Sequence, residues 1–178
     1  MGNLSLSDSF SVSSDSVWSV DNITADTTLT FSSDKNVNFG ALTLTGRADF
    51  RLGTGDITVS VSSPVTVGNT QKLQNGGGSF NFLGGLSLET GSELIGQGKQ
   101  VSGNIVLNGG QIATEQNTVL TDNLTQSADS TLQIDTSKTL TYSGAVVDIG
   151  TSKLNIQGGG SFINSAASAL SLNNSDSH

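Results

Sequence analysis

The sequence contains no cysteine, one proline and one histidine, His178, which is its last residue. Without cysteine the chain can form neither a disulfide nor a thiolate metal site. A histidine at the very end of the chain is a poor candidate for a catalytic triad, a general base or a metal ligand. We therefore expect no cofactor, no metal site and no enzymatic activity that depends on either residue type.

Basic residues and long apolar runs are scarce as well. The chain has seven Lys and Arg and fifteen Asp and Glu, which gives a formal net charge of −8. Binding to phosphates requires clustered basic side chains, so we expect neither nucleic acid nor an anionic membrane as a partner. The apolar runs are too short to span a bilayer. The start, "MGNLSLSDSF", lacks the basic and apolar regions of a signal peptide, and we interpret the chain as a fragment of a longer protein.

Two short repeats reveal a common period. The pentapeptide "GGGSF" occurs at 76–80 and at 158–162, a shift of 82 residues. The segment "ADTTL" at 25–29 returns as "ADSTL" at 128–132, a shift of 103 residues. Both shifts are multiples of about 20 to 21 residues, and a period of that size indicates stacked structural repeats.

Apolar residues fall into three columns when the chain is aligned at this period. The first column is Leu29, Phe50, Leu73, Leu94, Ile112, Leu132 and Leu154. The second is Val37, Ile57, Phe80, Val101, Val119, Leu140 and Phe162. The third is Leu42, Val65, Leu86, Ile105, Leu124, Val146 and Leu170. Polar residues precede every member of the first two columns, which is typical of strands with one buried face.

This pattern predicts an all-β fold without helices. We expect a right-handed parallel β-helix with three-strand coils of about 20 residues and seven to eight coils in all. The solenoid should span residues 25–172, preceded by an N-terminal cap or irregular first coil at 1–24 and followed by a disordered tail at 173–178. In this alignment Gly78 and Gly160 share one corner position, so we interpret "GGGSF" as a structural corner and not as a phosphate-binding loop.

The coil sequences carry a family resemblance. The segments "ADSTLQIDTSKTLTYSGAVVDIG" and "ADTTLTFSSDKNVNFGALTLTG" resemble the Ser/Thr/Gly-rich coils of bacterial autotransporter passengers and large surface adhesins. The resemblance implies a right-handed parallel β-helix that is located at the bacterial cell surface or secreted. It also implies a structural or adhesive function.

One segment offers candidate residues for ligand contact. In "GRADFRLGTGD", Arg47, Asp49, Arg51 and Asp56 are charged, and Asp49 and Arg51 flank the inward Phe50, so both should point outward. Glycosidases need two carboxylates placed across a sugar. The alternative is an ordinary solvated face. The outer column Asp49, Lys72, Glu93 predicts alternating charges on successive coils, a device that fixes register without a ligand.

The sequence therefore predicts a non-catalytic structural or adhesive shaft segment. The alternative is a carbohydrate-binding or polysaccharide-cleaving β-helix. Expected partners are flanking coils of a longer chain, self-association through the C-terminal end, a glycan or a host surface. The apolar residues within 1–24 could cover the N-terminal end, whereas the C-terminus offers no comparable cover.

Overall fold

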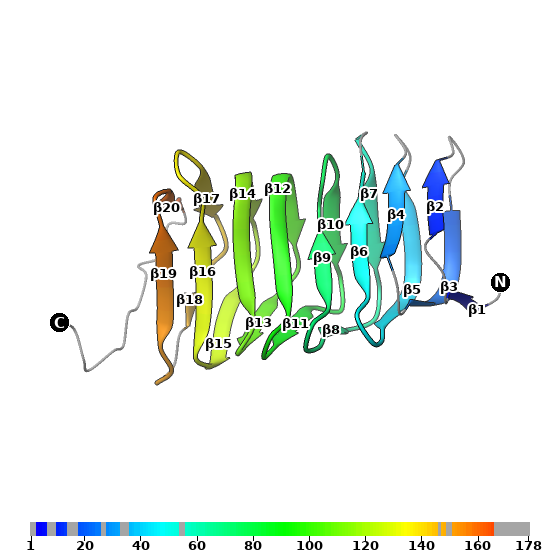
Figure 1. The fold of residues 1–178 in the computed structure, drawn as a ribbon, viewed down its shortest axis with the longest axis horizontal. Coiled ribbons are helices and arrows are strands. Elements are labelled where there is room, and N and C mark those ends of the chain that lie inside the picture. Colours follow the sequence, from blue (N-terminus) through cyan, green and yellow to red (C-terminus); the bar gives the residue numbers. More distant parts are fainter. Residues whose placement is uncertain are drawn as a thin grey trace.

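The computed structural model describes the backbone of residues 3–6, 10–13, 18–25, 28–32, 36–53, 56–145, 147–148 and 151–165. These residues form a rod of parallel strands, with β1 and β2 at one end and β19 and β20 at the other (Figure 1). The strands make a parallel β-solenoid of about six turns. The described residues contain no helix, and accordingly none that could cross a membrane. The predicted all-β solenoid is confirmed, while its right hand and its seven to eight coils stay predictions.

The described residues form twenty strands. They are β1 (Asn3–Leu6), β2 (Phe10–Ser13), β3 (Trp18–Ala25), β4 (Thr28–Ser32), β5 (Val37–Leu44), β6 (Asp49–Leu52), β7 (Thr58–Val61), β8 (Val65–Val67), β9 (Lys72–Gln74), β10 (Ser79–Phe82), β11 (Leu86–Glu89), β12 (Glu93–Ser102), β13 (Ile105–Asn108), β14 (Gln111–Leu120), β15 (Leu124–Ala128), β16 (Ser130–Ile134), β17 (Thr139–Tyr142), β18 (Val147–Asp148), β19 (Leu154–Gly158) and β20 (Ser161–Asn164).

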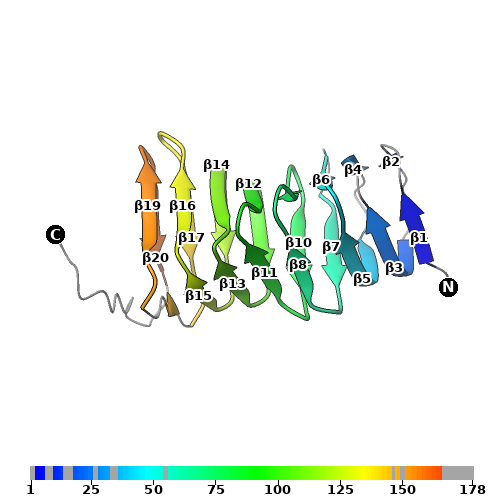
Figure 2. The ribbon, with the colours of Figure 1, turned by 60° about the horizontal axis from the view of Figure 1, so that its bottom comes forward.

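The strands lie on three faces of the rod. The first face runs β2, β4, β6, β9, the first halves of β12 and β14, β16 and β19. The second runs through the first halves of β3 and β5, then β7, β10, the second halves of β12 and β14, β17 and β20. The third runs β8, β11, β13, β15 and β18, with β1 and the second halves of β3 and β5 beyond its β8 end (Figure 2). Long strands that bend around a corner join the first two faces into one sheet.

The first predicted column is confirmed over six of its seven members. Leu29, Phe50, Leu73, Leu94, Ile112 and Leu132 are partners in successive ladders and are at most 1% exposed. The seventh member is wrong. Leu132 pairs with Ile156, and the predicted Leu154 pairs with Ser130, two residues earlier.

The second column needs three corrections, one of which is that Leu140 pairs with Thr118, while Leu120 pairs with Tyr142, two residues after Leu140. Val37 pairs with Val59, and the predicted Ile57 is instead buried at the corner before β7. Val101 pairs with Leu120, so the predicted Val119 does not point inward. The cause is a β-bulge: Gly96 pairs with Thr114 but Gln97 pairs with Gln116, which leaves one extra residue in β14. Because side chains alternate along a strand, that one residue turns Val119 outward.

The third column is confirmed from Val65 to Leu124, while the predicted Leu42 is buried but no ladder among the described residues joins β5 to β8. Val65, Leu86, Ile105 and Leu124 are ladder partners and are at most 2% exposed. Leu124 then pairs with Val147, one residue after the predicted Val146. Val146 and Leu170 lie outside the described residues.

Most strands carry a second inward residue that the three columns did not include. It lies two positions after the column residue, as side-chain alternation requires. Buried examples are Phe31 and Leu52 on the first face, Phe39, Val61 and Phe82 on the second, and Val67, Leu88 and Leu107 on the third. All of them belong to one core cluster that runs along the described part of the rod.

Strands β1, β2 and β3 enter the same parallel ladders as the rest of the rod. Residues Asn3–Leu6 pair with the end of β3, and Phe10–Ser13 pair with β4. The predicted boundary at residue 25 stays a prediction. The capping function proposed for 1–24 stays a prediction, and the predicted tail at 173–178 lies outside the described residues.

The two "GGGSF" glycines do occupy equivalent corners. Gly78 directly precedes β10 and Gly160 directly precedes β20. A Cβ at Gly78 would lie 2.5 Å from Ile57 Cγ2, and one at Gly160 would lie 2.3 Å from Ile134 Cγ2. Each corner therefore packs too closely against an apolar residue of the preceding coil to admit a side chain. Strands follow both glycines, so neither corner opens a helix N-terminus as a phosphate-binding loop would.

Candidate functional site

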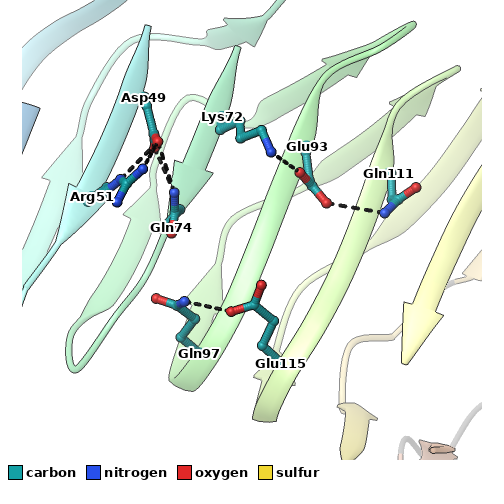
Figure 3. Close-up of polar contacts among 8 residues, drawn as sticks. All are labelled: Asp49, Arg51, Lys72, Gln74, Glu93, Gln97, Gln111 and Glu115. Atoms are coloured by element: carbon teal, nitrogen blue, oxygen red, sulfur yellow. Dashed lines mark hydrogen bonds and ion pairs between the residues drawn. The ribbon is translucent and has the colours of Figure 1, made fainter. Parts of the chain in front are cut away.

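Asp49 and Arg51 both point outward from β6, as the sequence predicted. The Arg51 guanidinium donates to the Asp49 carboxylate, with Arg51 Nε 2.8 Å from Oδ2, and the two side chains form an ion pair (Figure 3). This bond raises the pKa of Arg51. The carboxylate is 14% exposed and the guanidinium 47%. The cation thus covers much of the only carboxylate on β6.

A glutamine of the next coil completes the contacts of Asp49. Gln74 Nε2 on β9 donates to both carboxylate oxygens, at 2.8 and 3.0 Å. Asp49 is in register with Lys72, but its carboxylate is bound by Arg51 and Gln74. The predicted alternation would pair Asp49 with Lys72 of the next coil. In the structure the cation that binds Asp49 is instead Arg51 of the same strand.

The rest of the predicted outer column is confirmed. Lys72 Nζ lies 2.8 Å from Glu93 Oε2 on β12, and Gln111 Nε2 on β14 donates to Glu93 Oε1 at 3.2 Å (Figure 3). The hydrogen bond to Glu93 raises the pKa of Lys72, although partial burial opposes it. We call Asp49, Arg51, Gln74, Lys72, Glu93 and Gln111 the outer polar ladder. Each bond but one joins neighbouring coils.

The corner between the first two faces holds a second set of contacts between coils. Gln97 Nε2 donates to Glu115 Oε2 at 2.7 Å, and Lys138 Nζ donates to Gln116 Oε1 at 3.1 Å. Lys99 Nζ lies 2.6 Å from Asp56 Oδ1, and this hydrogen bond lowers the pKa of Asp56.

The Lys99–Asp56 pair spans an entire coil. Asp56 precedes β7 and Lys99 lies in β12, while the corner between β9 and β10 belongs to the coil between them. That intervening corner is Gly76-Gly77-Gly78, which carries no side chains. We infer that this triplet leaves room for the ion pair above it.

The four sequence-predicted residues do not act as one group. Asp49 and Arg51 contact each other, Asp56 is paired with Lys99, and Arg47 lies exposed in the turn before β6. Sequence analysis missed Gln74 and Lys99. The Asp-x-Arg spacing on one strand, which places both side chains on the same face, was the signal available for the Asp49–Arg51 pair.

A hollow lies beside the outer polar ladder, where β12, β14 and β16 begin. Its volume is about 230 Å³, and its lining includes Glu93, Gln111, Asp129, Ser130 and Thr131. Both carboxylates in it already have partners, because Glu93 binds Lys72 and Asp129 Oδ1 accepts the Lys153 backbone N–H at 2.8 Å. Within the described part of the chain, no group of three or more His, Cys, Asp or Glu side chains could hold a metal ion.

Comparisons with known protein families, with curated proteins and with solved structures gave no significant match to this chain.

Proposed function

We propose that this chain is a shaft segment, a stiff non-catalytic spacer in a bacterial cell-surface or secreted protein. The proposal rests on one observation: hydrogen bonds and ion pairs on the outside of the rod run along its axis, from one coil to the next. Lys72–Glu93, Gln74–Asp49 and Gln97–Glu115 each join one coil to the next along the rod. Side chains used in this way stabilise the stack itself. The core adds to this, since it runs through successive coils as one cluster.

The surface location rests on the composition of the coils. Segments rich in Ser, Thr and Gly, without cysteine, resemble the passengers and adhesins named above. Protease accessibility on intact cells of the source bacterium tests this: cleavage of the chain without cell lysis is expected, and protection from protease contradicts the surface location.

Single-molecule pulling from the two chain ends tests the shaft function. A stack of coils bound mainly to their neighbours should resist extension and then yield in units of about 20 residues, each releasing roughly 65–70 Å of chain. Smooth extension at low force, without such steps, would contradict the proposal. The variant Glu93→Gln should lower the force most at the β9–β12 step, with a smaller change at the β12–β14 step, where Glu93 also binds Gln111.

The carbohydrate alternative is favoured by the hollow that contains Glu93 and Asp129. A screen for binding and product release on pectins, glycosaminoglycans and neutral glycans tests it, with Glu93→Gln, Asp129→Asn, Asp49→Ala and Asp56→Ala as variants. We expect no release. Release by the wild type that is lost in any of these folded variants would overturn the shaft proposal and assign the residue to a site.

A further inference from the structure

The C-terminal end of the described rod presents strand edges to solvent. Among the described residues β19 pairs with β16 and β20 pairs with β17, so each has a ladder on one side (Figure 1). Ile156 of β19 pairs with Leu132 and thereby continues the first inward column. Every earlier described member of that column is at most 1% exposed, whereas Ile156 is 46% exposed. The coil that would bury it comes from outside the described residues.

Strands β19 and β20 of this edge lack the features that prevent strand addition. Natural edge strands are protected by charged side chains, proline or bulges, because their free N–H and C=O groups pair with any suitable strand. Residues 154–165, "LNIQGGGSFINS", contain no charged residue and no proline. β20 adds Ile163, which is 47% exposed. The edge is therefore suited to a further parallel strand.

The opposite end of the rod presents the matching set of strands. There β1 pairs with β3, β2 pairs with β4, and residues Trp18–Val20 pair with β5. These segments lie on the third, first and second faces, and β18, β19 and β20 end the same three faces in the same order. All ladders are parallel, so both ends run in the same strand direction. Within each coil the chain passes from the first face to the second and then to the third. β20 lies on the second face and β1 on the third, so β1 of a second copy would follow β20 in this order.

We propose that the C-terminal coil binds the N-terminal coil of a second copy of this chain, head to tail. In this arrangement β2 of one copy pairs with β19 of the other, and the position of Phe10 continues the column that ends at Ile156. The same contact repeats on every copy without closing, so it builds an unbranched fibre. The inference does not depend on the shaft proposal, since a chain used for another purpose would have the same ends.

Sedimentation velocity and X-ray scattering of the full chain over a range of concentrations test the proposal. We expect species that grow in length at constant cross-section. Ile156→Lys should shift assembly to a concentration at least about a hundredfold higher, because assembly would bury an unpaired charge. In the free chain this lysine reaches solvent at the open end, so the variant should fold, which circular dichroism and a thermal melt verify. The matched control is Leu83→Lys, an apolar residue 66% exposed on the side of the rod, and it should assemble normally.

A mixing experiment determines the polarity of assembly. Ile156→Lys retains an intact N-terminal end, so one copy per ten wild-type copies should add to fibre ends and shorten the fibres several-fold. Tail-to-tail pairing of two C-terminal coils would instead give dimers, with no shortening beyond dilution. Three outcomes would overturn the proposal. The full chain could form dimers that do not grow, or it could stay monomeric at all concentrations. Alternatively, Leu83→Lys could lose assembly while Ile156→Lys retains it.

Discussion

Two parts of the rod share one ladder pattern but fill their interiors differently. Within residues 28–82 the core is built from phenylalanine rings: Phe50 lies 5.6, 6.1 and 5.8 Å from Phe31, Phe39 and Phe80 between ring centroids. Within residues 93–142 the same positions hold Leu, Ile and Val. Tyr142 is the one buried ring there among the described residues.

This difference between the two interiors indicates which side chains fix the register between coils. Both register shifts in the described ladders, at Gly96/Gln97 and at Leu107/Asn108, lie in the part without phenylalanine. Thr114 Oγ1 and Gln126 Oε1 are buried there without a hydrogen-bond partner among the described residues. Large rings that interlock between coils tolerate no extra residue, whereas smaller side chains leave space for a bulge.

The largest expected effect comes from charging the inward column of the aliphatic part. Leu94→Asp would bury an unpaired carboxylate between Leu73 and Ile112, and we expect a loss of at least about 4 kcal/mol in the free energy of unfolding. Val119→Asp should cost at most about 1 kcal/mol, because the bulge turns Val119 outward. Urea unfolding measures both. Equal losses in the two variants would show that the bulge is misplaced.

Removing a ring should cost more than removing an aliphatic side chain in the same column. Phe50→Ala and Leu132→Ala both empty a position that is 0% exposed. We expect about 4–5 kcal/mol for Phe50→Ala and about 3 kcal/mol for Leu132→Ala. The difference reflects the larger cavity and the lost ring contacts, which are worth about 0.5–1.5 kcal/mol each. A greater loss for Leu132→Ala, measured by the same urea unfolding, would refute the view that the rings stabilise the first part.

The corner asparagines allow a finer comparison of the two parts. Asn75 is 0% exposed; its Oδ1 accepts the Gln97 backbone N–H at 2.6 Å and its Nδ2 donates to Gly98 O at 3.3 Å. Asn117 Oδ1 accepts the Thr139 N–H at 2.9 Å on an exposed corner.

Asn75→Ala should therefore lower the free energy of unfolding by about 1–2 kcal/mol, since it leaves two partly buried backbone groups without their partner. Asn117→Ala should cost about 0.5 kcal/mol or less, because water replaces the lost partner. Native-state hydrogen exchange at Gln97 and Thr139 checks both. Fast exchange at Gln97 in the wild type would contradict the bond to Asn75.

The sequence predicted the strands and most of the core because side-chain alternation and the coil period are local properties. The first column, from Leu29 to Leu132, needed only the spacing between apolar residues. The sequence could not predict the bulge opposite Gly96. The pattern Thr118-Val119-Leu120 is compatible either with an inward Val119 or with inward Thr118 and Leu120. Nor could the sequence place Gln74 on Asp49 or Lys99 on Asp56, since those contacts depend on side-chain length and on the glycine corner between two coils.

The smallest effect concerns the bond that joins the two parts, Lys72 of β9 to Glu93 of β12. The Lys72 ammonium is 45% exposed, so solvent screens the pair, and Lys72→Met should cost only about 0.2–0.5 kcal/mol at pH 7. Folding raises the pKa of Lys72, so the stabilisation is fully present below about pH 10.4 and disappears as the pH rises through the higher folded-state value. The difference in urea midpoint between wild type and Lys72→Met should accordingly vanish at pH above that value, and shrink in 1 M salt. Lys153→Met, at an exposed lysine near β19, should leave the urea midpoint at pH 7 unchanged. A Lys72→Met difference that persists unchanged at high pH would mean that the lysine stabilises the junction through its methylene chain and not through its charge.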